Sequence, residues 1–265
     1  MRSLPGFLTL VLGIFMIGCG QEAPPPGGLQ GQLTLTGSST IAPLASLIAK
    51  RFEAQHPGVR IDVQTGGSSR GIADARSGLA DIGMSSRALG SAEQTGVATH
   101  VLAQDGIGFV VHASNPVATL TPQQAKAIYT GQLTQWKEQG QADAKIVVIN
   151  RAQGRSELNL VTDHFQIKPS QMVADVIAGE NQQCVKLVAG NAQAIAYLSL
   201  GAARYEVDRA ASIKLLTYAD QAQLNRPLVL IAKPKPSKLA AAFLAYALSP
   251  QVHDLIEEQA FVPAQ

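Results

Sequence analysis

The sequence predicts an α/β fold, and three of its features indicate this. Short strand-like stretches alternate along the chain with amphipathic helical stretches, as in proteins whose helices cover a largely parallel sheet. Several of the strand-like stretches end in Gly- and Ser-rich turns that lead directly into a helix. The part after residue 32 is long enough for one large domain or for two smaller lobes.

The hydrophobic pattern places the elements one after another. A strand begins at Leu33 and breaks at Gly37, and Ile41, Leu44 and Ile48 then recur at helical spacing up to the stop at residues 56–58. The further predicted strands are 59–63, 80–84, 107–112, 145–150, 184–188, 194–198 and 228–232, and the further predicted helices are 72–79, 122–129, 156–165, 238–248 and 252–259. For the helix over 122–129 we expect Thr121 as N-cap and Pro122 at the first helical position.

The N-terminus reads as an export signal. Arg2 is followed by an apolar run over residues 7–17, which is the length of a signal-peptide core and too short for a permanent membrane span. Residues 16–19 (MIGC) resemble the lipobox of bacterial lipoproteins, although Met16 stands where Leu is usual, and we expect lipid attachment at Cys19. The alternative is an ordinary secretory signal with a spare cysteine. We therefore predict a signal peptide over 1–18 and a flexible Pro- and Gly-rich tether over 19–32.

The composition argues against several classes of partner. A net charge of +2, with 15% charged and 5% aromatic residues, gives neither a nucleic-acid footprint nor stacking platforms for bases. With Cys19 assigned to lipid, Cys184 has no disulfide partner, and we expect a buried, inert thiol in a half-buried strand. No metal-ligand spacing occurs, so we expect no metal and no cofactor.

Three loops of one kind carry the functional signal: 37–40 (GSST), 66–71 (GGSSRG) and 151–156 (RAQGRS), each between a strand and a helix. A helix N-terminus offers unpaired N–H groups and partial positive charge, and glycine allows an anion to approach the backbone. Hydroxyls add neutral donors, and arginine adds a fork that fits tetrahedral oxyanions. Any single loop could be a plain N-cap, but together the three predict an anion site.

The chain resembles the periplasmic phosphate-binding proteins of phosphate ABC importers, which belong to the type II periplasmic-binding-protein family. The segments that carry the resemblance are Gly37–Pro43, Gly66–Arg87, Ala103–Pro116, Leu120–Trp136, Asn150–Gly154 and Ala194–Ala203. The resemblance implies two α/β lobes joined by two hinge crossings, near 107–111 and 227–231. One lobe would comprise 33–110 plus 230–265 and the other 111–229, with the ligand trapped between them.

The resemblance also implies a ligand set. The expected phosphate-binding residues are Ser39, Thr40, Ser68, Ser86, Arg87, Asp105, Arg151, Arg155 and Ser156. The alternative role for Arg87 is to brace the site without contacting the ligand. Two departures from the family pattern stand out. Family members usually read Gly-Ser-Gly-Thr where this chain has Gly154–Glu157 (GRSE), so Arg155 either supplies a second cation or pairs with Glu157. Some members carry at the position of Ser86 an aspartate that accepts a hydrogen bond from the protonated phosphate. Asp105 or Glu157 could take that role, or Asp105 could cap the loop beside Gly106.

The function implied is capture of inorganic phosphate and its delivery to the permease of an ABC importer, without catalysis, by a monomer in the periplasm or on the outer cell surface. Its one membrane contact would be the lipid anchor. Alternatives are another oxyanion such as sulfate, molybdate or phosphonate, or phosphate sensing. A serine hydrolase is a further alternative, because residues 67–71 match G-x-S-x-G with Ser69 as nucleophile, followed by Asp105 or Asp163 and His164 or His253. The polar alternation of strand 59–63 and the lack of an HGGG-like loop argue against it.

Overall fold

The computed structural model describes residues 28–139 and 144–264. The strands are β1 (Gln30–Gly37), β2 (Gly58–Thr65), β3 (Ile82–Ser85), β4 (Ala98–His112), β5 (Thr119–Leu120), β6 (Val147–Arg151), β7 (Val176–Ala178), β8 (Ala194–Ser199), β9 (Ile213–Leu215), β10 (Thr217–Tyr218), β11 (Asn225–Ala232) and β12 (Val262–Pro263). The helices are α1 (Ala42–Gln55), α2 (Ser68–Ser77), α3 (Pro122–Tyr129), α4 (Ser156–Phe165), α5 (Asn181–Ala189), α6 (Leu200–Asp208), α7 (Lys238–Ala247) and α8 (His253–Glu258).

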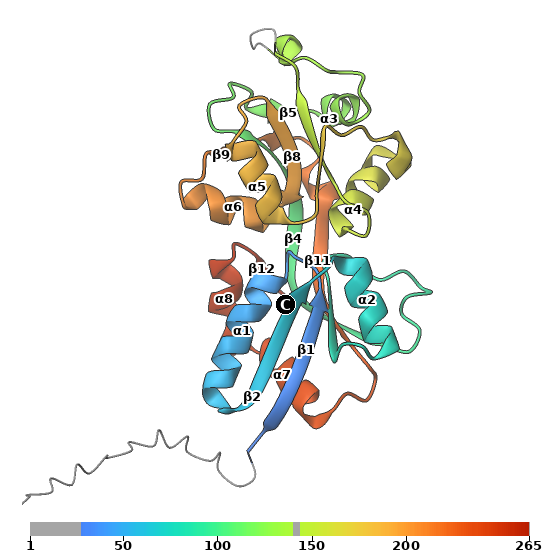
Figure 1. The fold of residues 1–265 in the computed structure, drawn as a ribbon, viewed down its shortest axis with the longest axis vertical. Helices are drawn as coiled ribbons and strands as arrows, with labels where there is room; N and C mark the ends of the chain where they lie inside the picture. Colours follow the sequence, from blue (N-terminus) through green and yellow to red (C-terminus); the bar gives the residue numbers. More distant parts are fainter. Residues whose placement is uncertain (1–27, 140–143, 265) are drawn as a thin grey trace, which may run out of the picture.

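The main sheet runs through both halves of an elongated molecule (Figure 1) in the order β2-β1-β3-β11-β4-β8-β6-β7. Strands β2, β1 and β3 are parallel, and β11 runs antiparallel to both β3 and β4. In the other half, β8 pairs antiparallel with β4 and parallel with β6. The two-stranded sheet β10-β5 packs in that second half.

Two strands connect the halves. Strand β4 is 15 residues long; its first part, up to Gly106, pairs with β11, and its second part, from Ile107, pairs with β8. In Figure 1, β4 and β11 run together from the lower half, which holds α1, α2, α7 and α8, to the upper half, which holds α3 to α6. A chain that crosses twice between two halves has the layout of a hinged two-lobed protein, and the resemblance led us to expect this.

The buried apolar side chains divide in the same way. One core comes from β1, β2, β3, α1, α7, α8 and the first part of β4, and it includes Phe52 and Phe243. A second core, around Phe109, Tyr129 and Trp136, comes from residues between Ile107 and Leu224. Each lobe therefore has an apolar interior of its own. The lobe boundaries given above stay a prediction.

Most of the predicted elements are confirmed. Helix α4 begins and ends as expected, and α3 begins with the expected Thr121 cap, whose hydroxyl accepts a hydrogen bond from the backbone N–H of Gln124. The prediction of a strand over residues 184–188 was wrong, because this stretch belongs to helix α5. There Cys184, Val185 and Val188 are buried at helical spacing. An apolar run this short fits both the repeat of a helix and the repeat of a strand. Helix α6 was missed.

A glycine brings the loops of the lower lobe close together. Gly37 has φ of +132°, and a Cβ atom there would lie 2.2 Å from the backbone oxygen of Met84. Only glycine permits this backbone conformation and so close an approach. Strand β1 therefore ends directly beside β3, and the backbone N–H of Ser38, in the loop that follows β1, donates to the carbonyl of Met84 in β3.

The described residues include no group of His, Cys, Asp and Glu side chains that could hold a metal ion. In the same part of the chain no single helix is long and apolar enough to cross a membrane. The segments Lys238–Ala247 and Pro250–Glu258, which are bent relative to each other, reach the required length and apolar composition only when taken together. The predicted signal peptide and Cys19 lie outside the described residues.

Candidate functional site

The three predicted anion loops meet between the lobes. The loops before α1 and α2 belong to the lower lobe, and the loop before α4 belongs to the upper lobe. The backbone N–H of Ser69, at the start of α2, donates to the carbonyl of Gly154 at 3.3 Å, so the ends of α2 and α4 touch across the cleft. The N-cap residues of these two helices, Gly67 and Arg155, make no side-chain cap. The plain capping interpretation therefore does not explain the second and third loops.

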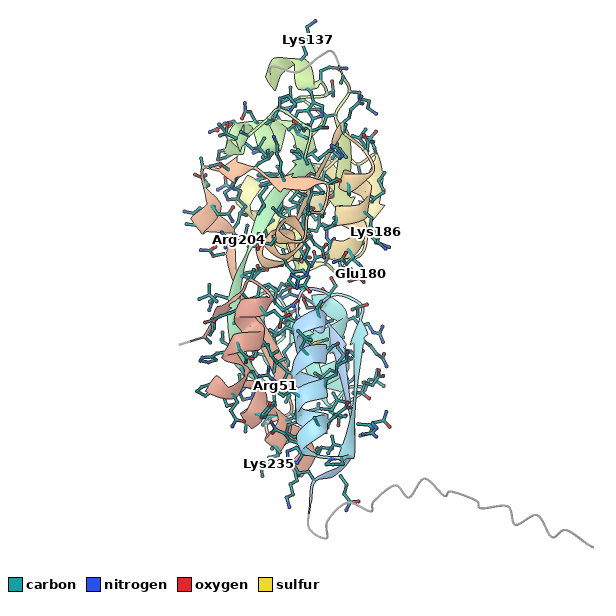
Figure 2. The ribbon with its side chains drawn as sticks, turned by 90° about the vertical axis from the view of Figure 1, so that its left-hand side faces the viewer. Arg51, Lys137, Glu180, Lys186, Arg204 and Lys235 are labelled. Carbon is teal, nitrogen blue, oxygen red and sulfur yellow. The ribbon has the colours of Figure 1, made fainter. Side chains whose placement is uncertain are left out.

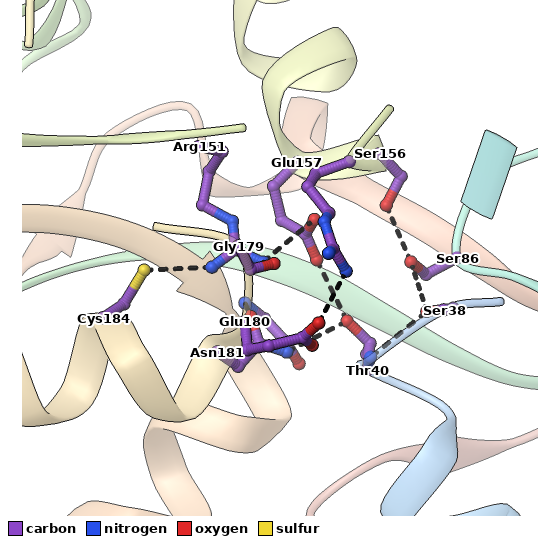
Figure 3. Close-up of polar contacts among 12 residues, drawn as sticks. Ser38, Thr40, Ser86, Arg151, Ser156, Glu157, Gly179, Glu180, Asn181 and Cys184 are labelled. Atoms are coloured by element: carbon purple, nitrogen blue, oxygen red, sulfur yellow. Dashed lines mark hydrogen bonds and ion pairs between the residues drawn. The ribbon is translucent and has the colours of Figure 1, made fainter. Parts of the chain in front are cut away.

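Four buried serine hydroxyls form a chain between the lobes, and Figure 3 shows three of them, Ser38, Ser86 and Ser156. Ser38 donates to Ser86 at 2.9 Å, and Ser86 lies 2.7 Å from Ser156 and 3.4 Å from Ser68. The backbone N–H of Ser86 also donates to the Ser68 hydroxyl at 3.1 Å. Because Ser156 begins α4 and the other three belong to the lower lobe, the chain gives neutral donors to both sides of the cleft.

The central cation is Arg226, on the hinge strand β11. Its side chain is 1% exposed and forms an ion pair with Asp105, with an Nη2–Oδ2 distance of 2.9 Å. Nη1 donates to the Ser156 hydroxyl at 2.8 Å, and Nη2 also donates to the Thr40 hydroxyl at 3.2 Å and to Glu157 Oε1 at 3.0 Å. One guanidinium thus contacts both lobes and the other hinge strand, β4, which carries Asp105.

A second buried cation lies at the end of β6. Arg151 donates to the Cys184 sulfur at 3.0 Å and to the carbonyl of Gly179 at 3.3 Å. Its Nε is buried and has no hydrogen-bond partner among the described residues. A buried donor without a partner is costly, so this nitrogen is available to an acceptor that enters the cleft.

The carboxylate of Glu157 lies between the two arginines. Oε1 accepts from the Thr40 hydroxyl at 3.0 Å, and Oε2 lies 3.6 Å from Arg151 Nη2 (Figure 3). Burial by itself would raise the pKa of Glu157, but the positive charges of Arg226 and Arg151 outweigh burial and lower that pKa to about 2. Glu157 is therefore ionised at neutral pH. Asn181, at the start of α5, completes the contact by donating to the Thr40 hydroxyl at 3.1 Å.

Six of the nine predicted ligand residues come together here: Thr40, Ser68, Ser86, Asp105, Arg151 and Ser156. Ser39 lies at the edge, where it lines a groove of about 640 Å³ together with Thr40 and Asn181. Arg87 and Arg155 pair with carboxylates outside this cluster. Arg87 pairs with Glu93 at 2.7 Å, and Arg155 pairs with Glu180 at 3.0 Å and not with Glu157. Figure 2 shows Glu180 at the level of the gap between the lobes.

Sequence reasoning missed Arg226, Ser38 and Asn181. The signal for Arg226 was present, because this charged residue directly precedes the apolar run that was predicted as a hinge strand. A charge at the edge of such a run is either solvated or paired, and β11 places Arg226 in the interior. Ser38 is inside the first predicted loop, and Asn181 has no neighbouring sequence pattern that marks it.

Comparison with known proteins identifies the family of this chain. The model of the PBP superfamily domain matches residues 22–251. The chain belongs to this superfamily. Its structure resembles a substrate-binding protein assigned to a phosphate ABC transporter of Clostridium perfringens, solved with bound phosphate, with a TM-score of 0.81 and 28% identity over 89% of this chain and 100% of that one. It also resembles an ABC-type phosphate transport receptor from Vibrio cholerae, with a TM-score of 0.69 and 31% identity over 88% of this chain and 100% of that one.

A relative found by sequence is the phosphate-binding protein PstS 2 of Streptococcus agalactiae, 38% identical over 109 residues, which are 41% of this chain. The chain covers only 37% of the length of that relative. The two-lobed periplasmic-binding-protein fold expected from the resemblance is confirmed by these matches.

Proposed function

We propose that this protein captures inorganic phosphate between its lobes and delivers it to an ABC importer. The observation that carries the proposal is the cluster in the cleft, where two buried guanidiniums and four serine hydroxyls from both lobes converge. Such a set suits a tetrahedral oxyanion, because arginine forks and hydroxyls donate to several oxygens at once. The similarity to a phosphate-bound protein from Clostridium perfringens supports this choice of anion.

The setting of this function is part of the proposal. The protein would act outside the cytoplasm as a monomer, held to a membrane by lipid on Cys19, with the importer's permease as its partner. The export-signal pattern of the first 19 residues supports this location.

The hydrolase alternative has no support. Ser69 is exposed, and it follows β2, which is an edge strand of the sheet and not a central one. Asp105 pairs with Arg226, and His164 lies 2.7 Å from the Tyr218 hydroxyl. A nucleophile elbow requires a central strand and a base within reach of the serine.

Calorimetric titration of the purified, ligand-free protein tests the proposal. We expect one phosphate per chain, and we expect Arg151→Ala to weaken binding at least about tenfold, because charged hydrogen bonds contribute roughly 1.5–3 kcal/mol each. Arg60→Ala is the matched control and should bind as the wild type does, because the Arg60 guanidinium lies outside the cluster and donates to the neighbouring backbone carbonyls of Pro57 and Val59. Sulfate, molybdate and a phosphonate are titrated in parallel. Binding of one of these without phosphate would assign another oxyanion, and no binding at all would refute an anion carrier.

A further inference from the structure

Glu157 occupies a position that a bound anion would need. Its side chain is 3% exposed, and its carboxylate oxygens contact the Thr40 hydroxyl and the guanidiniums of Arg226 and Arg151. Hydroxyl and guanidinium donors of this kind are also what an oxyanion would require. A ligand that reached all three donors would have to share them with a carboxylate already in place.

The charges in the cleft lead to the same conclusion. Arg151 and Arg226 supply two positive charges, and Asp105 and Glu157, both buried, supply two negative charges. The nearby third cation, Arg155, is paired with Glu180. The centre of the site therefore carries no excess positive charge before a ligand enters, which is unusual for a cleft that attracts an anion.

The carboxylate also links the two lobes. Glu157 belongs to α4 in the upper lobe, and the Thr40 hydroxyl that donates to it precedes α1 in the lower lobe. Arg226 joins the same contact from the hinge strand β11. In a two-lobed binding protein a ligand usually bridges the lobes in this way, and here a side chain of the protein does so.

We propose that Glu157 is a built-in competitor, whose carboxylate holds the anion position in the ligand-free protein and must yield Thr40 and Arg226 to the incoming anion. This inference rests on the proposed function, since it concerns the same site. Its consequence is a reduced affinity, because a site that is free for only one tenth of the time binds its ligand about tenfold more weakly. Glu157 would thus set how readily the protein releases its anion.

The decisive variant is Glu157→Gln, which keeps the shape of the side chain and removes its charge. We expect phosphate to bind about tenfold more tightly to this variant than to the wild type in calorimetric titration. Glu93→Gln is the matched control, because it removes the same charge from an arginine pair outside the cluster and should leave the affinity unchanged. Unchanged affinity in Glu157→Gln would overturn the proposal, and weaker binding would overturn it by making the carboxylate a contact of the ligand.

A second variant and a second measurement make the test independent of whether Glu157→Gln folds and of the phosphate affinity. Glu157→Thr carries a side chain too short to reach Arg226, and it should also bind phosphate more tightly, so it replaces the glutamine variant should that one fail to fold. Small-angle X-ray scattering of the ligand-free proteins should show a larger radius of gyration for Glu157→Thr than for the wild type, because the shorter side chain no longer reaches the Thr40 hydroxyl across the lobes. Equal radii would contradict the bridging role. A wild type that binds no phosphate would refute the proposed function, while the scattering result would still decide whether Glu157 closes the lobes.

Discussion

Replacing Arg226 with methionine should destabilise the ligand-free protein more than removing any exposed arginine. The guanidinium donates hydrogen bonds to Asp105, Ser156, Thr40 and Glu157, and its side chain is 1% exposed. Methionine has a similar volume, so the main cost comes from two buried carboxylates that lose their cation. Breaking a buried ion pair from one side costs about 3–5 kcal/mol, and Arg151 can compensate Glu157 only in part from 3.6 Å.

The assay is urea denaturation at neutral pH, followed by circular dichroism, without phosphate. Arg51→Met is the matched control, because Arg51 pairs with Asp254 on the surface of the lower lobe (Figure 2), with side chains 35% and 63% exposed. We expect a much smaller loss there, since exposed pairs are screened by water. If both variants lost equal stability, the buried network would contribute no more than a surface pair. Adding Asp105→Asn to Arg226→Met should then recover part of the loss, because one unpaired charge is removed.

Three further predictions concern pH, a glycine and the free thiol. The folded-state pKa of Glu157, at about 2, is below its ordinary value, so ionised Glu157 stabilises the fold above about pH 4.5 and this stability is lost as the pH falls toward 2. The melting temperature of Glu157→Gln should therefore fall less over this pH range than that of the wild type. An equal fall in both proteins would contradict the lowered pKa of Glu157. Gly67→Ala should weaken phosphate binding, because φ is +93° and a Cβ would lie 2.8 Å from the Gly154 carbonyl across the cleft. Gly78→Ala is the control, because Gly78 also has a positive φ, +79°, but has open space around it, so this variant should lose stability and keep its phosphate affinity. Calorimetric titration of both variants separates the loss of affinity from the loss of stability. Cys184 is fully buried and burial raises the pKa of its thiol, so a thiol reagent should react only on unfolding, and rapid reaction of the native protein would show that this helix opens.

The sequence was most informative where a local pattern determines the structure. The capping signal at Thr121 and the alternation of residues 59–63 depend on neighbouring residues, and both predicted the observed elements. The segment around Cys184 shows the limit, because four or five apolar residues fit a strand and a helix equally well. Its helical state depends on packing against β8, which lies later in the chain.

The site could be predicted in part for a similar reason. Loops that begin helices can be recognised in the sequence, and six of the nine residues chosen from them and from the family pattern lie together. The partners of the charged residues could not be predicted, because pairing depends on contacts between distant parts of the chain. Arg226 lies 121 positions from Asp105, and Arg155 has Glu180 within reach although Glu157 is closer in sequence.

The chain of serine hydroxyls in the cleft bears on how an anion would leave. A hydroxyl can donate and accept, so Ser38, Ser86, Ser68 and Ser156 satisfy one another when nothing lies between them. A site lined only by cations would be left with unpaired buried donors on emptying, and that cost would oppose unloading. Here the four serine hydroxyls already have partners in one another. If the protein carries an anion as proposed, this pairing among the hydroxyls lowers the cost of releasing the anion to the transporter.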